Sequence, residues 1–137
     1  MSGAARLLIG LALGLATLVG PAASAQDPKS PKPQYLPFAD FAPDDSATQV
    51  SAKQAYNDAV ERYNKALYDY HVTLGQHDQL VEQYNRAGTP ADREKARADA
   101  APLRARLQTL RRDVTALATT VDQARRRATQ AGVTLSR

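Results

Sequence analysis

Apolar and aromatic positions recur along residues 56–84 at alternating intervals of four and three. Every seventh position carries a ring, in the order Tyr56, Tyr63, Tyr70, His77 and Tyr84. An aliphatic residue stands four positions after each of the first four rings, namely Val60, Leu67, Leu74 and Val81. This alternation is typical of the seam of a coiled coil. The pattern therefore predicts one long helix with an apolar stripe.

A second stripe with the same intervals follows in the carboxyl-terminal half. It consists of Ala96, Ala100, Leu103, Leu107, Leu110, Val114, Leu117, Val121, Ala124, Ala128 and Ala131. Ser46 and Gln49 have the spacing of a capping box, so the first helix is predicted over 46–86.

Between the stripes, the sequence marks a tight turn over 87–89. We expect Gly88 to end the first helix in a left-handed conformation. Thr89 and Pro90 have the residue types of an N-cap and a first helical position, so the second helix is predicted over 90–131 and a tail over 132–137.

Reversal of the chain at Gly88 brings Leu67 opposite Leu110 and Leu74 opposite Leu103. The two stripes therefore meet in phase if the helices pair within one chain. The predicted fold is all-α, an antiparallel two-helix coiled-coil hairpin.

Two helix breakers, Gly75 and Pro102, fall at the same level of this hairpin. Proline costs about 3 kcal/mol and glycine about 1 kcal/mol in a helix interior relative to alanine. We expect a bend or hinge at this level. Alternatively, Pro102 could begin a separate helix capped by Asp99.

The first 25 residues have the pattern of a signal peptide. Arg6 precedes an apolar stretch of 13 residues over 7–19, and Ala23-Ser24-Ala25 offers small residues for cleavage. We expect an exported protein, periplasmic or secreted after cleavage near Ala25. An uncleaved membrane anchor is the alternative, although 13 residues fall short of the roughly 20 that span a bilayer.

Residues 26–45 are predicted to be a proline-rich flexible linker, because five prolines exclude a helix or a central strand. An aromatic patch within it contains Tyr35, Phe38 and Phe41. These rings could dock onto a partner protein, or they could fold back and cover the base of the helix pair.

One further column beside the first stripe is also apolar or small, and comprises Ala52, Ala59, Ala66, Thr73 and Leu80. The apolar face is thus wider than a two-helix seam requires. Dimerisation into a four-helix bundle, or a partner protein binding near Leu80, would cover it. Alternatively, the small residues only allow the two helices to approach closely.

Charge is distributed unevenly over the chain, whose net charge is +4. Residues 46–86 contain four basic and five acidic residues, whereas residues 89–131 contain ten basic and five acidic ones. The candidate anion-binding residues are Arg104, Arg111, Arg112, Arg125 and Arg126. They could attach to an anionic membrane or wall polymer, or they could form an ordinary solvated face.

The sequence offers little for catalysis. It contains no cysteine, and its two histidines, His71 and His77, are not spaced as a ligand pair on one helix face. We therefore predict no catalytic residues, metal or cofactor, and no binding to nucleic acid. The preferred function is a non-enzymatic interaction protein of the bacterial cell envelope that acts as a spacer, adaptor or clamp. A module attaching through its arginines to an anionic surface is the alternative, and a carrier of a small ligand or metal is a third reading.

Overall fold

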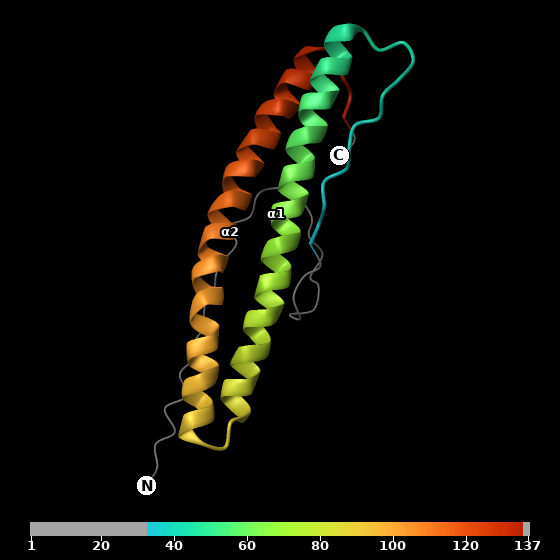
Figure 1. Ribbon diagram of the computed structural model, residues 1–137. Helices are drawn as coiled ribbons and strands as arrows, with labels where there is room; N and C mark the ends of the chain where they lie inside the picture. The colour runs from blue at the N-terminus through green and yellow to red at the C-terminus, as the bar shows by residue number, and fades with distance from the viewer. Residues whose placement is uncertain (1–32, 136–137) are drawn as a thin grey trace, which may run out of the picture. The chain divides into compact units, whose positions relative to one another are not determined.

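The computed structural model describes residues 33–135, which contain two long helices joined by a short loop. Helix α1 spans Ala47–Arg86 and helix α2 spans Pro90–Gln130, and the two lie side by side in opposite directions (Figure 1). No strand occurs among the described residues. The predicted all-α helical hairpin is confirmed. The predicted signal peptide, residues 26–32 and the last two residues lie outside the described residues.

Both helices begin as their sequences predict. The backbone N–H of Gln49 donates to Ser46 Oγ at 3.2 Å, and Ser46 N–H donates to Gln49 Oε1 at 2.9 Å. This reciprocal capping box satisfies two backbone groups that the first turn of α1 leaves unpaired. At α2, Thr89 Oγ1 accepts from the N–H of Asp92 at 3.2 Å, with proline in the first turn.

The loop between the helices differs from its prediction. Gly88 does not adopt a positive φ, and among the described glycines only Gly132 does, with φ 80°. Ala87 leaves α1 with φ −62° and ψ 126°, and Thr89 is also extended. The prediction of a left-handed stop at Gly88 was wrong, because the chain passes from extended Ala87 to the extended Thr89 cap without a positive φ at Gly88.

The left-handed glycine instead ends α2. Val133 N–H donates to the carbonyl of Ala128 at 2.9 Å, and Gly132 N–H donates to that of Thr129 at 3.0 Å. This pair of bonds is the Schellman motif, which turns the chain back toward the helix it has just left. Residues 133–135 consequently fold back on the hairpin, and Val133 is buried.

Pro102 lies inside α2, which continues without interruption on both sides of it. The alternative of a separate helix beginning at Pro102 is therefore wrong. Pro102 and Ala98 are both exposed, so water can reach the carbonyl of Ala98 that the missing N–H leaves unpaired. Helix α1 also runs unbroken through Gly75. The hinge itself stays a prediction.

The face of α1 that is buried in the hairpin is rotated from the predicted seam. Ala59, Ala66 and Thr73 are buried, whereas Leu67 and Leu74 are only half-buried. The column that contains Ala59, Ala66 and Thr73 is thus largely inside the hairpin, and dimerisation of the chain stays a prediction. Small residues at these positions let the helices approach closely, as the alternative interpretation held.

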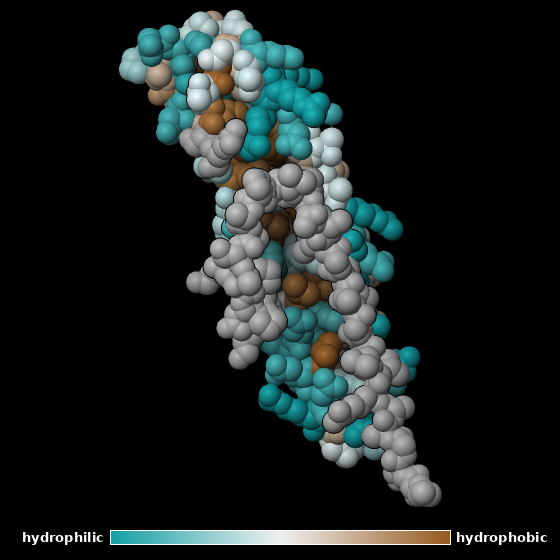
Figure 2. All heavy atoms as spheres, turned by 180° about the vertical axis from the view of Figure 1, so that it is seen from behind, coloured by the Kyte–Doolittle hydropathy of each residue, from teal (hydrophilic) through white to brown (hydrophobic). Residues whose placement is uncertain are grey.

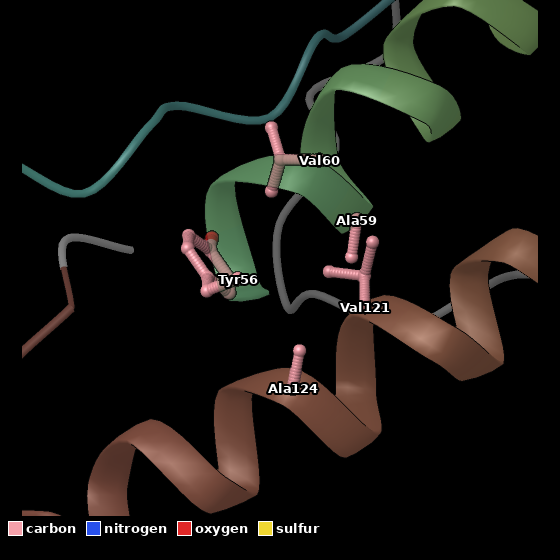
Figure 3. Packing of buried hydrophobic residues seen from close by; sticks show 5 residues of the cluster. All are labelled: Tyr56, Ala59, Val60, Val121 and Ala124. Atoms are coloured by element: carbon pink, nitrogen blue, oxygen red, sulfur yellow. The ribbon is translucent and has the colours of Figure 1, made fainter. Parts of the chain in front are cut away.

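The largest buried cluster lies at the end of the hairpin opposite the loop, here called the base (residues 47–64 and 117–135). It comprises Tyr56, Ala59, Val60, Val121 and Ala124. Figure 3 shows Ala59 pointing at Val121 across the helix pair, whereas Val60 points toward the segment that precedes α1. Leu36, Ala39 and Leu135 pack against this cluster from outside the helices. The base therefore has a third layer, formed by residues on either side of the hairpin.

Candidate functional site: the docked arm

Residues 33–45, here called the arm, lie along α1 in the opposite direction. Asn64 accepts the N–H of Leu36 at 2.8 Å and donates to its carbonyl at 2.9 Å. Asn57 accepts the N–H of Ala39 at 2.7 Å and donates to its carbonyl at 3.0 Å. Residues 33–45 were predicted as part of a flexible linker. They are instead an extended segment attached to α1 by both side-chain amides.

Helix and arm fit each other in register. Asn57 and Asn64 are seven residues apart, so they lie on one face of α1, separated by about 10.5 Å along its axis. The three residue steps from Leu36 to Ala39 cover about 9 to 10 Å when the chain is extended. Each amide can therefore pair with one backbone N–H and one C=O, as a neighbouring β-strand would.

The arm shows a repeat of three residues. Pro33, Leu36 and Ala39 are half-buried, while the positions between them are exposed. A period of three is typical of polyproline II conformation, which the prolines of this segment favour. One edge of the arm thus faces α1 and the others face away from it.

The three rings of the arm occupy a second edge, here called the aromatic ridge: Tyr35, Phe38 and Phe41. They are 47%, 53% and 50% exposed. The sequence had left two possibilities open, a docking motif or a cover for the base. The arm itself folds back on the base, but its rings do not take part in that cover. The residues that cover the base are Leu36 and Ala39.

The carboxyl-terminal end of the arm is fixed to α1 by an ion pair. Lys53 Nζ lies 2.6 Å from Asp45 Oδ2, and the two side chains are only 10% and 8% exposed. The N–H of Ala42 also donates to Asp45 Oδ2, at 2.8 Å. The hydrogen bond from Lys53, followed by that from Ala42, holds the pKa of Asp45 below its ordinary value of 3.8. Tyr56 adds a longer bond from its hydroxyl to the carbonyl of Pro37, at 3.4 Å.

Leu80, the remaining candidate for partner binding, is half-buried on α1 near the loop, and it lies far along the helix from the aromatic ridge. Other apolar side chains on α1 are more exposed, namely Tyr68 and Val72. Where the surface is not drawn in grey, Figure 2 shows apolar patches between hydrophilic borders along one face of the hairpin. The described residues do not bring Leu80 and the rings into one site.

The candidate anion-binding arginines are spread along α2. From Arg104 to Arg126 the helix rises about 33 Å. Arg104 and Arg125 are half-buried, whereas Arg111, Arg112 and Arg126 are exposed. Arg111 and Arg112 line a shallow hollow of about 440 Å³ with Gln108 and Thr115. None of the five arginines forms an ion pair with another described residue.

The histidines are isolated from each other and from clusters of carboxylates. His77 is buried, with Nδ1 3.7 Å from Asp78 Oδ1 and no hydrogen-bond partner for Nε2 among the described residues. Desolvation lowers the pKa of His71 below its ordinary value of 6.5. Within residues 33–135, no three His, Asp or Glu side chains are grouped closely enough to hold a metal ion.

Sequence reasoning missed the two asparagines that hold the arm. A signal was present, because Asn57 and Asn64 are one heptad apart on α1 and polar amides flank an otherwise apolar stripe. The three-residue spacing of the rings was also visible. Sequence reasoning did not connect the three-residue repeat of the arm with the seven-residue spacing of Asn57 and Asn64 on α1.

No protein-family model matches the chain, and neither a search of curated proteins nor one of solved structures gives a significant match. In the part of the chain that the structure describes, neither helix has an apolar stretch long enough to cross a bilayer. The surface of the hairpin and its arm therefore carries the features that bear on function.

Proposed function

We propose that this chain is an exported, non-enzymatic interaction protein of the bacterial cell envelope, which binds another protein through its aromatic ridge. The observation that carries the proposal is the exposure of Tyr35, Phe38 and Phe41 on a segment whose backbone is held by hydrogen bonds. The hairpin acts as a rigid spacer or adaptor that presents the ridge. The proposal of export rests on the sequence of residues 1–25, and a mature protein beginning at Met1 would contradict cleavage.

Physical reasons favour a binding role for the ridge. Large rings supply much of the energy at protein interfaces, and they gain most when they are buried in a partner's pockets. Because the arm is already fixed to α1, binding the rings requires little additional ordering of its backbone. The bonds from Asn57 and Asn64 therefore lower the entropic cost of presenting the ridge.

Affinity capture with the full chain tests this function. The immobilised protein is compared with Phe38→Ala/Phe41→Ala, and Asp40→Ala serves as a control that changes an exposed arm residue between the rings. We expect the double variant to lose at least tenfold in capture of a specific envelope protein, with its melting temperature within about 2 °C of the parent, because exposed residues contribute little to stability. Undiminished capture by the double variant would contradict the proposal.

Attachment to an anionic membrane or wall polymer is the second candidate. It is favoured by the hollow at Arg111 and Arg112, which have no ionic partner among residues 33–135. Salt separates the two functions, because the Debye length falls from about 10 Å at 0.1 M to about 3 Å at 1 M. Attachment through arginine should weaken steeply over this range, and attachment through the rings should not.

A further inference from the structure

We infer that the face of α1 beneath the arm is a recognition site for an extended peptide of a partner protein, and that the arm is a resident competitor for it. This inference goes beyond the proposed function, because the peptide would occupy the face of α1 that the arm leaves and not the aromatic ridge. The peptide carries an apolar residue at every third position and runs antiparallel to α1.

The site is built to bind peptide backbone. Asn57 and Asn64 each contact an N–H and a C=O of a single arm residue, at 2.7 to 3.0 Å. These bonds require residues that have an N–H, so proline is excluded at the two paired positions. Proline is accepted between them, as Pro37 shows. The site thus selects extended segments with two non-proline apolar residues three positions apart, and it does not require leucine and alanine in particular.

The hydrogen-bonded part of the arm can leave α1 without unfolding the helix pair. Its inward residues, Leu36 and Ala39, are only half-buried, whereas Tyr56 beneath them is 1% exposed. Segments with few buried apolar contacts open more readily than the core they cover. The ion pair of Asp45 with Lys53 lies at the carboxyl-terminal end of the arm, so the preceding residues can leave α1 without breaking it.

A longer peptide can outcompete the arm because the same stripe of α1 continues beyond Asn64. It contains half-buried Leu67, Leu74 and Val81, with polar His71 and Asp78 beside them. The hydrogen bonds of the described arm residues to α1 reach Asn64 and go no farther. A peptide that keeps this three-residue spacing beyond its contact with Asn64 would place apolar side chains along Leu74 and Val81.

A second copy of this chain is the weaker occupant. Exchanged arms would make the same contacts between chains that they make within one, so exchange adds no contact. The tethered arm also benefits from an effective concentration in the millimolar range. A foreign peptide that continues along Leu67, Leu74 and Val81 has a source of affinity that an exchanged arm lacks.

Fluorescence anisotropy with labelled synthetic peptides tests the inference on the full chain. The short probe has the sequence of residues 33–43, and the long probe has that of residues 26–43 with leucine in place of Asp27 and Ser30. The Leu36→Asp/Ala39→Asp variant weakens the tethered arm and leaves α1 unchanged. We expect both probes to bind this variant at least tenfold more tightly than the parent, and the long probe to bind more tightly than the short one.

Adding Asn57→Ala/Asn64→Ala to the arm variant should weaken binding at least tenfold, while adding Gln76→Ala, an exposed amide outside the column of Asn57 and Asn64 on α1, should not. Asn57→Asp/Asn64→Asp keeps the size of both side chains and removes their hydrogen-bond donors, so it should weaken binding as well. Circular dichroism should show that both variants remain helical. Probe affinity that is unchanged by the substitutions of Asn57 and Asn64 would overturn the inference, as would the absence of binding at 1 mM probe. A dimer of the parent chain that dissociates when Asn57 and Asn64 are replaced would also overturn it, because the occupant of the site would then be a second copy.

The two proposals can fail separately. Phe38 and Phe41 belong to the arm and are 53% and 50% exposed, so Phe38→Ala/Phe41→Ala should not remove the binding site on α1. Loss of ring-dependent capture with intact probe binding would contradict the proposed function alone. Ring-dependent capture without any probe binding would contradict only the inference about the peptide site.

Discussion

The base of the hairpin and its middle are built from the same apolar stripes, but they differ in what covers them. At the base, Tyr56 and Val60 are 1% and 0% exposed. In the middle, Leu67 and Leu74 occupy the same stripe of α1 as Val60 and are only half-buried. The difference comes from the arm and the tail, which pack on the base from outside the helices. Two helices alone expose the flanks of their shared stripe, and a third layer is needed to bury a large side chain fully.

This comparison assigns different tasks to the two regions. The base holds the buried hydrophobic cluster, on which residues of the arm and the tail pack. The middle is a longer and more open interface in which small or polar residues, such as Ala66, Thr73 and His77, are the buried ones on α1. Stability should therefore concentrate at the base.

Removing the ring of Tyr56 from the base should give the largest change in the free energy of unfolding. Tyr56→Ala should cost about 3 to 5 kcal/mol in the free energy of unfolding, because it empties a fully covered position. Leu67→Ala, a comparable truncation in the middle, should cost about 1 to 2 kcal/mol, since that side chain is already partly exposed to water. Urea unfolding followed by circular dichroism measures both. Equal costs would mean that the third layer adds nothing to the packing.

Replacing the glycine at the turn between α2 and the tail should have a smaller effect on stability. Gly132→Ala should destabilise by about 1 kcal/mol, because a side chain at a positive φ is strained even where space allows it. Space is not limiting, since an added Cβ would lie 3.6 Å from Gln49 Nε2. Gly88→Ala is the control at the other end of the hairpin, with no positive φ and no neighbour within 4 Å, and it should be neutral. Thermal unfolding of the two variants measures the difference, and equal melting temperatures would contradict it.

The ion pair at the end of the arm should make the base sensitive to acid. The pKa of Asp45 is lowered in the folded state, so its carboxylate stabilises the fold above a pH of about 4, and this contribution is lost as the pH falls through the lower folded value. In Asp45→Asn, the corresponding part of the acid dependence should be absent. Unfolding curves of both proteins between pH 5 and pH 2 give the difference, and parallel pH profiles would contradict the assignment.

Much of the hairpin could be predicted from the sequence because its signals are local. Ser46, Gln49, Thr89 and Pro90 act through neighbouring backbone groups, and the stripes act through helical periodicity. Gly88 was assigned incorrectly because glycine permits a left-handed conformation without requiring it. The choice depended on the path the chain takes to the Thr89 cap.

The candidate site was predicted only in part, because it depends on contacts between segments that are distant in sequence. The rings were recognised as candidates, but which arm residues face α1 is decided by Asn57 and Asn64, which are 18 and 28 residues away from their partners. The rotation of the seam toward Ala59, Ala66 and Thr73 likewise depends on how closely α2 approaches. Neither can be derived from periodicity alone.

Three residue steps along the arm span about the same length as seven along α1. This equality limits which insertions and deletions the chain can accept. Inserting or deleting one residue between Leu36 and Ala39 would move every preceding arm residue to a different edge, so that residues now facing water would meet the helix. Changes of three residues in the arm keep the edges, and changes of seven in the helix keep the stripe. Insertions and deletions in this protein should therefore come in multiples of three residues in the arm and of seven in α1. The spacing of the asparagines on α1 and of the rings in the arm should constrain the sequence more strongly than the identity of the residues between them.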